Sequence, residues 1–164
     1  MLMGLVDNFI THGFRRIVVI NGHGGNDVPG RQAMFETRQQ YRERKDLLLL
    51  FATYWNLAQP TQDSIADLEQ DEMGHACEWE TSMILHLRPD LVKQHEKVKA
   101  VLPGNSFQPA QRAWTMLDRS QVGHIGAPAN ASARKGEQLL DLFSQGVSEL
   151  IQRVIRWKGE SWDG

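Results

Sequence analysis

The sequence predicts an α/β fold in which helices are layered on a buried parallel sheet. Two short runs carry this prediction. In RRIVVI at 15–20, two arginines are followed by four apolar residues, and LLLLFATYW at 47–55 is mostly apolar. Such runs are typical of strands that are buried on both faces of a parallel sheet. The segments around them give the order helix, strand, loop, helix and strand, which favours an α/β layered fold. We expect a single domain over residues 1–164.

Helical spacing marks the elements on either side of these strands. The first segment carries one apolar stripe, formed by Leu2, Leu5, Val6, Phe9 and Ile10. Gly13 follows, where a helix would end in a left-handed cap. Residues 31–45 favour a second helix, with Ala33, Met34 and Tyr41 as its expected inner contacts.

The rest of the chain alternates between irregular and helical sequence. The acidic stretch 59–74 predicts a loop, and residues 75–87 predict a helix that stops before Pro89, because the residue ahead of a proline disfavours helix. Prolines and glycines within 98–128 predict irregular structure. An apolar stripe from 139 to 155 predicts a long amphipathic helix.

Charge and composition argue against several classes of protein. The chain has 18 basic and 20 acidic residues and a net charge of −2, whereas nucleic-acid-binding proteins usually carry a strong basic excess. No apolar run approaches the ~20 residues of a membrane-spanning helix. The single cysteine cannot form an internal disulfide, so we expect a reducing compartment, by default the cytoplasm.

The first motif with chemical potential is Asn-Gly-His-Gly-Gly-Asn at 21–26, directly after a predicted strand. Ligands of open α/β sheets bind at the carboxyl ends of strands. Glycines such as Gly24 and Gly25 allow close approach of the backbone to a ligand, and the imidazole of His23 is a potential metal ligand. A tight turn with an exposed histidine and a phosphate cradle are the alternatives, although neither the Rossmann nor the Walker spacing is present.

The second motif is His-Ala-Cys-Glu-Trp-Glu-Thr-Ser at 75–82. If this segment is helical, His75 and Glu78 share a face, and Glu80 lies about 200° away from Glu78 at ~100° per residue. A histidine and a carboxylate three residues apart can serve one metal ion. The alternative is an ordinary first turn of a helix, where the dipole favours glutamate. Cys77 is expected to be a buried spectator, and His124, in a glycine-rich loop, is a weaker candidate.

Together these motifs resemble the creatininase (creatinine amidohydrolase) family. The resemblance rests on GFRRIVVINGHGGN at 13–26, TYW at 53–55, GHACEWETSMILHLRPDLV at 74–92, VGHIGAP at 122–128 and ARKGEQLL in the last helix. It implies a three-layer α/β/α sandwich with a mainly parallel sheet and a homo-oligomeric assembly. It also implies a metal-dependent hydrolase that acts on amide or cyclic amide C–N bonds of small-molecule substrates, with two divalent ions, zinc or manganese, in the intact site.

The resemblance also implies roles for individual residues. His23 and Glu78 would bind metal, with Glu78 replacing a family glutamate at the position of Gly25. His75 would be the general acid, and Trp55, Gly24 and Gly25 would line the substrate pocket. Glu80 and His124 rank lower as site residues.

The family's N-terminal metal-binding pattern, E-x-H-G-x-H-x-P-x-x-T-D, has no match in residues 1–164. We therefore expect that the N-terminal part of the family domain is missing, and that the chain is a truncated amidohydrolase whose own activity has to be tested. The alternative is a non-catalytic α/β interaction module that has lost the metal site.

Overall fold

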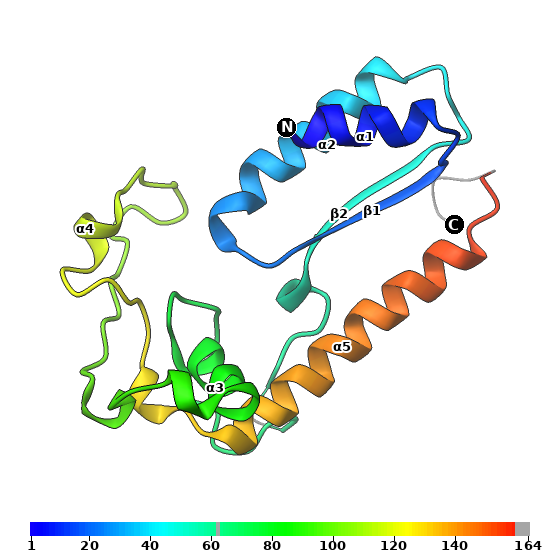
Figure 1. Ribbon diagram of the computed structural model, residues 1–164. Coiled ribbons are helices and arrows are strands. Elements are labelled where there is room, and N and C mark those ends of the chain that lie inside the picture. The colour runs from blue at the N-terminus through cyan, green and yellow to red at the C-terminus, as the bar shows by residue number, and fades with distance from the viewer. Residues whose placement is uncertain (62, 160–164) are drawn as a thin grey trace. The chain divides into compact units, whose positions relative to one another are not determined.

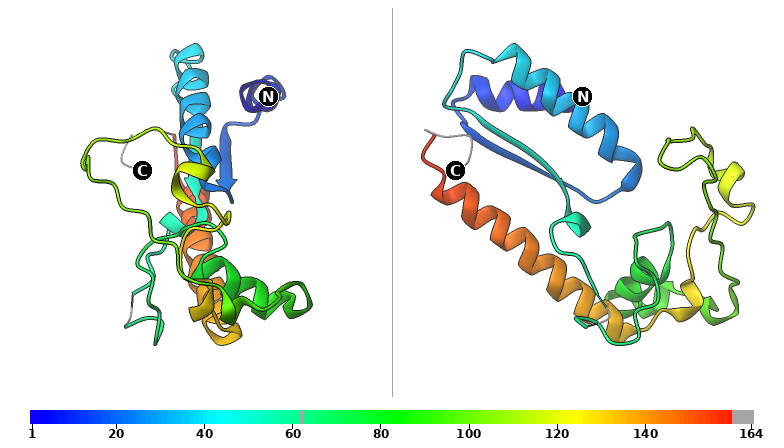
Figure 2. Two further views of the ribbon diagram at one scale, coloured as in Figure 1. Left: turned by 90° about the vertical axis from the view of Figure 1, so that its left-hand side faces the viewer. Right: turned by 180° about the vertical axis from the view of Figure 1, so that it is seen from behind.

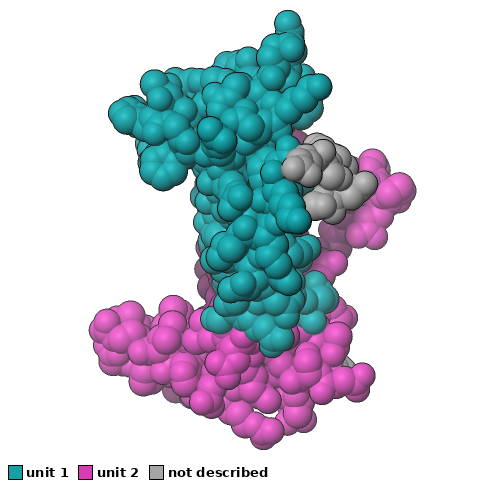
Figure 3. Space-filling view, turned by 90° about the vertical axis from the view of Figure 1, so that its right-hand side faces the viewer, with its two compact units in different colours: residues 1–59, 143–164 teal, residues 60–142 magenta. Residues whose placement is uncertain are grey.

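The computed structural model describes residues 1–61 and 63–159 and divides the chain into two compact units. The first unit combines residues 1–59 with the chain from Phe143 onward, and the second comprises Pro60–Leu142 (Figure 3). The long last helix, α5, spans Ala133–Arg156 and contributes to both. Among the described residues, no helix is both long and apolar enough to cross a membrane.

The first unit has the predicted order of elements. It contains α1 (Leu2–Thr11), β1 (Arg16–Asn21), α2 (Asp27–Gln40) and β2 (Leu48–Thr53). The two strands pair in parallel, in a register that runs from Arg16 opposite Leu48 to Asn21 opposite Thr53. The α/β fold class and the positions of both strands are confirmed. The expected burial on both faces is not, because Ile20 of β1 is 41% exposed and most of β2 is only partly buried in this two-stranded sheet.

Helices cover both faces of this sheet. The α1 and α2 helices lie on one face, and the C-terminal half of α5 lies on the other (Figures 1 and 2). The core between the sheet and the first two helices consists of Val6, Ile10, Ile17, Met34 and Leu47. Burial of such side chains contributes roughly 1.5–3 kcal/mol each. The first unit is therefore an α/β/α arrangement, as the resemblance implies.

The backbone confirms the expected end of the first helix. Gly13 has a φ of 89°, in the left-handed region that glycine adopts without a steric penalty. Its amide donates to the carbonyl of Ile10, which closes the last turn. The chain then turns into β1.

The second unit is mostly irregular, as predicted for residues 98–128. Its helices are α3 (Glu78–Leu87), the four-residue α4 (Met116–Arg119) and the first part of α5. Two isolated antiparallel bridges, between His75 and Ile125 and between Val101 and Gly126, tie its loops together. The buried apolar residues of this unit include Ile65, Leu68, Trp79, Met83 and Leu139.

The helix predicted at 75–87 begins three residues later than expected. Cys77 is its N-cap and is extended, with a φ of −86° and a ψ of −172°. The preceding Ala76 has a left-handed φ of 46°. His75 is extended and exchanges two backbone hydrogen bonds of 2.8 Å with Ile125. The prediction that His75 and Glu78 share a helix face is wrong, because a tertiary bridge holds His75 outside the helix.

Candidate functional site

The glycine-rich motif lies at the carboxyl ends of both strands of the first unit. The side chain of Asn21, the last residue of β1, donates to Thr53 Oγ1 and to the carbonyl oxygen of His23, at 2.9 Å in each case. The amide of His23 donates to Asn21 Oδ1 at 3.1 Å, and Thr53 Oγ1 donates to Asp27 Oδ1 at 2.8 Å. Because Asn21 is buried, this network fixes the backbone that carries His23 at the edge of the sheet.

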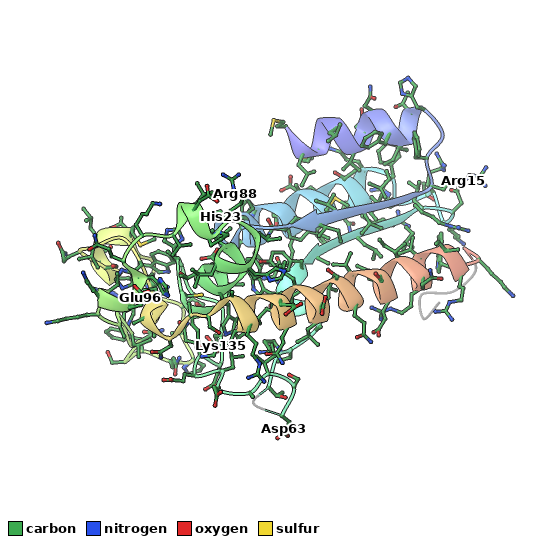
Figure 4. All side chains as sticks on the ribbon, turned by 60° about the horizontal axis from the view of Figure 1, so that its bottom comes forward. Arg15, His23, Asp63, Arg88, Glu96 and Lys135 are labelled. Atoms are coloured by element: carbon green, nitrogen blue, oxygen red, sulfur yellow. The ribbon has the colours of Figure 1, made fainter. Side chains whose placement is uncertain are left out.

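His23, labelled in Figure 4, is exposed, and its ring lies close to Gly25. A Cβ atom at Gly25 would lie 3.0 Å from His23 Nε2, and a Cβ at Gly24 would lie 4.0 Å from the indole of Trp55. These residues therefore form one cluster at the strand ends, and Gly25 leaves room for the imidazole. The sequence predicted all four as site residues.

The remaining site candidates belong to the second unit, and three of them line one cavity. It has a volume of about 480 Å³. Its polar wall includes His75, Glu80 and His124, which come from a bridge strand, from α3 and from a loop. The other lining residues are Ala76, Thr81, Ile84, Leu91, Val92, Lys93, His95, Val98 and Pro128.

Backbone contacts hold the polar wall of this cavity in place. The Glu80 carboxylate accepts the amide of Ala76 at 2.5 Å, which couples the first turn of α3 to the segment that carries His75. His124 is almost buried, and its Nε2 contacts the carbonyl oxygen of Lys99 at 2.8 Å. His75, by contrast, is exposed to the cavity and to solvent. An imidazole, a carboxylate and a second imidazole thus face an open space that can admit a small molecule.

Glu78 lies outside this cavity lining. Its side chain is fully buried, and its carboxylate accepts a hydrogen bond of 2.7 Å from the Lys135 ammonium, with which it forms an ion pair. The amides of Glu69 and Gln70 donate to the same carboxylate at 3.1 and 2.8 Å. The structure therefore shows Glu78 in a buried ion pair with Lys135, and its expected role as a metal ligand stays a prediction.

His95 is a cavity residue that the sequence did not reveal. It lies in a charged stretch with no motif, and only the fold of the second unit brings it beside the cavity. Cys77 is buried, as predicted, and burial raises the pKa of its thiol above the usual range. A raised pKa makes Cys77 a poor nucleophile, because the thiolate is the reactive form.

The described residues do not by themselves provide a metal centre. No group of three or more histidine, cysteine, aspartate or glutamate side chains within them is arranged to hold an ion. A dinuclear catalytic site needs ligands for two ions. Within the described residues, neither His23 in the first unit nor the cavity residues of the second unit provide enough ligands for such a site.

The sequence profile of the creatininase family, described as creatinine amidohydrolase, matches residues 1–151. The chain belongs to the creatininase family. Among curated members, it is 30% identical to the mycofactocin precursor peptide peptidase of Mycolicibacterium smegmatis over 144 residues, which are 87% of this chain and 50% of the peptidase. It is 30% identical to the creatinine amidohydrolase of Pseudomonas putida in a match that covers 92% of this chain and 62% of that enzyme.

Solved structures of creatininases share the fold. A mutant creatininase superposes with a TM-score of 0.75 at 25% identity, covering 94% of this chain and 62% of that structure. Related structures at 24% identity are described as creatininase with manganese, and as a Zn-Zn type of a mutant creatininase. This chain thus spans about half to two thirds of the length of the creatininase-family proteins that it matches.

Proposed function

We propose that this creatininase-family chain hydrolyses an amide-type C–N bond of a small molecule or of a peptide end. The observation that carries the proposal is the cavity of the second unit, where His75, Glu80 and His124 meet from three separate segments. Membership of a family that contains an amidohydrolase and a peptidase supports this reaction class. In the reaction, water adds to the carbonyl carbon, the C–N bond breaks and the leaving nitrogen takes a proton.

His75 is the residue that we assign to the proton transfer. Its imidazole is exposed at the cavity, and histidine suits transfer near neutral pH. Its two backbone bonds to Ile125 hold it at a fixed place on the cavity wall. Ile84, Leu91 and the other apolar lining residues would exclude water from the bound substrate.

We further propose that the protein uses a divalent metal, zinc or manganese, and that His23 is one of its ligands. The manganese and zinc forms of related creatininases support metal use. Glu80 is a better candidate ligand than Glu78, because Glu80 lines a cavity while Glu78 is buried against Lys135. Since the described residues lack a complete site, any metal centre needs further ligands. When bound, a divalent metal would polarise the carbonyl and activate water.

The test is turnover of creatinine and of short peptides by the purified chain in millimolar Mn²⁺ or Zn²⁺. We expect His75→Asn to lower kcat by ~10²- to 10⁴-fold, the usual contribution of a general acid. His86→Asn is the matched control, because His86 lies exposed on α3 and outside the cavity lining. Equal activity of the two variants would contradict the assignment of His75.

Trp55→Phe tests the prediction that Trp55 contacts the substrate. Because the indole lies beside Gly24, we expect a raised KM with a smaller change in kcat. A folded chain that turns over neither substrate class with either metal would contradict the proposed function. It would favour the alternative of a non-catalytic α/β interaction module.

A further inference from the structure

The second unit contains a buried ion pair that takes no part in the proposed reaction. Glu78, at the start of α3, is fully buried. Lys135, labelled in Figure 4, lies in the first turn of α5 and is 8% exposed. Their charged atoms lie 2.7 Å apart. Buried ion pairs often contribute little net stability, because desolvation opposes the attraction between the charges. The contacts around the pair therefore have to explain what it does.

The carboxylate of Glu78 ties the acidic loop to the helix. It receives the amides of Glu69 and Gln70, and the Gln70 side chain returns to the helix by accepting the amide of Glu78 at 2.9 Å. The same Gln70 Oε1 accepts the amide of Ala127 at 2.7 Å. Through Gln70, the carboxylate of Glu78 is thus connected to the loop segment that contains Ile125.

Lys135 brings a third segment into the same contact. Besides Glu78, its ammonium donates to the carbonyl oxygen of Asn130 at 2.7 Å. The neighbouring Gly136 fits against the backbone of α3, where a Cβ atom would lie 2.0 Å from the carbonyl oxygen of Ser82. The ammonium therefore holds the start of α5 and the turn before it against α3.

The segments that meet at this pair also form the wall of the cavity. His124 lines the cavity, and its neighbour Ile125 forms the backbone bridge with His75. The amide of Ala127, two residues further on, donates to the side chain of Gln70. We propose that Glu78 and Lys135 form a clamp, and that these two positioning residues hold His75 and His124 in place on the cavity wall. The clamp rests on the proposed function for its catalytic meaning, but its mechanical effect can be measured without a substrate.

Two features distinguish the clamp from a local stabilising contact. A carboxylate can accept several hydrogen bonds at once, and here it takes two amides and one ammonium. The two amides come from the acidic loop and the ammonium comes from α5, so the carboxylate joins two separate segments to the start of α3. Loss of the charge should therefore release segments that do not touch Glu78, including the bridge between His75 and Ile125.

The experiment is hydrogen–deuterium exchange on the full chain, with variants of both partners. In Glu78→Gln we expect the amides of Glu69 and Gln70 to exchange faster by at least ~10-fold, together with those of His75 and Ile125. The β1 and β2 amides of the first unit should keep their wild-type rates. Lys135→Arg retains the charge, so the same amides should exchange at near wild-type rates. Lys135→Met removes the charge, so these amides should exchange faster.

The double variant Glu78→Met with Lys135→Met covers the case in which a single variant fails to fold. It leaves no unpaired buried charge, and such replacements are often tolerated, yet it removes the acceptor for the two loop amides. Asp90→Asn is the matched control, since Asp90 pairs with Arg88 on the exposed surface of the same unit. We expect fast exchange of the bridge amides in the double variant and no change in the control.

Unchanged exchange at His75 and Ile125 in the folded double variant would overturn the clamp. Equal acceleration of all amides of the second unit would also overturn it, because it would mean a general loss of stability. Kinetics separate the clamp from the proposed function. If the wild-type chain hydrolyses none of the tested amides while the bridge amides respond as expected, the function fails and the clamp stands. If the chain is active and exchange is unchanged, the clamp alone fails.

Discussion

The contact between α3 and α5 predicts a large effect of adding one methyl group at Gly136. A Cβ at this position would lie 2.0 Å from the carbonyl oxygen of Ser82, 2.5 Å from its carbonyl carbon and 2.9 Å from the amide nitrogen of Met83. All three are backbone atoms, so no side-chain rotation can relieve the overlap, and the two helices have to move apart. Overpacking of this kind costs typically about 3 kcal/mol at its upper range.

The helical propensity of alanine offsets part of this cost. Alanine is favoured over glycine inside a helix by about 1 kcal/mol, so we expect Gly136→Ala to lower the free energy of unfolding by about 2 kcal/mol. For a chain of this size, each kcal/mol shifts Tm by roughly 2–4 °C. Gly136→Ala should therefore lower Tm by roughly 4–8 °C, as measured by circular dichroism at 222 nm.

Gly4→Ala is the matched control for this prediction. Gly4 lies within α1, and nothing is found within 4 Å of the Cβ position. This substitution should raise the free energy of unfolding by about 0.5–1 kcal/mol. If Gly136→Ala is as stabilising as Gly4→Ala, the close approach of α3 and α5 is wrong.

Four further predictions concern metal, ionisation and association. Isothermal titration of the chain with Zn²⁺ or Mn²⁺ should show weak binding at most, since the described residues contain no group of three or more histidine, cysteine, aspartate or glutamate side chains arranged to hold an ion. Two submicromolar sites per chain would contradict this. Cys77, whose pKa burial raises, should react with a thiol reagent at pH 8 only as fast as the chain opens, and unfolding in urea should remove this protection. A hydrogen bond from Arg44 lowers the pKa of Asp46 to about 2. The stabilisation from this ionised carboxylate is therefore present above the unfolded-state pKa of about 4 and is lost as the pH falls through about 2. Arg44→Met should move the pKa of Asp46, followed by NMR, back toward about 4. The chain should self-associate at tens of micromolar, because Phe14, Phe35 and other large apolar side chains are exposed, and a monomer in light scattering would contradict this.

The sequence by itself determined the elements whose signals are local. The apolar runs at 15–20 and 47–55 fold as β1 and β2, because continuous apolar sequence has to be covered on both faces. Gly13 ends α1 as predicted, since the left-handed φ that it adopts is costly for other residues. The glycine motif after β1 also lies at the strand ends, with Trp55 beside it, because both follow paired strands directly in the chain.

Tertiary contacts decided the second unit. Helical periodicity placed His75 and Glu78 on one face, but the bridge between His75 and Ile125 pulls His75 into an extended conformation, and α3 begins at Glu78. The partner of Glu78 is Lys135, 57 residues away in the sequence. No local sequence pattern predicts an ion pair at that separation. The cavity likewise depends on His95 and His124, which only loop packing brings beside Glu80. Local sequence encodes backbone propensity, whereas the charge environment of a buried carboxylate is set by segments that only the folded chain brings together.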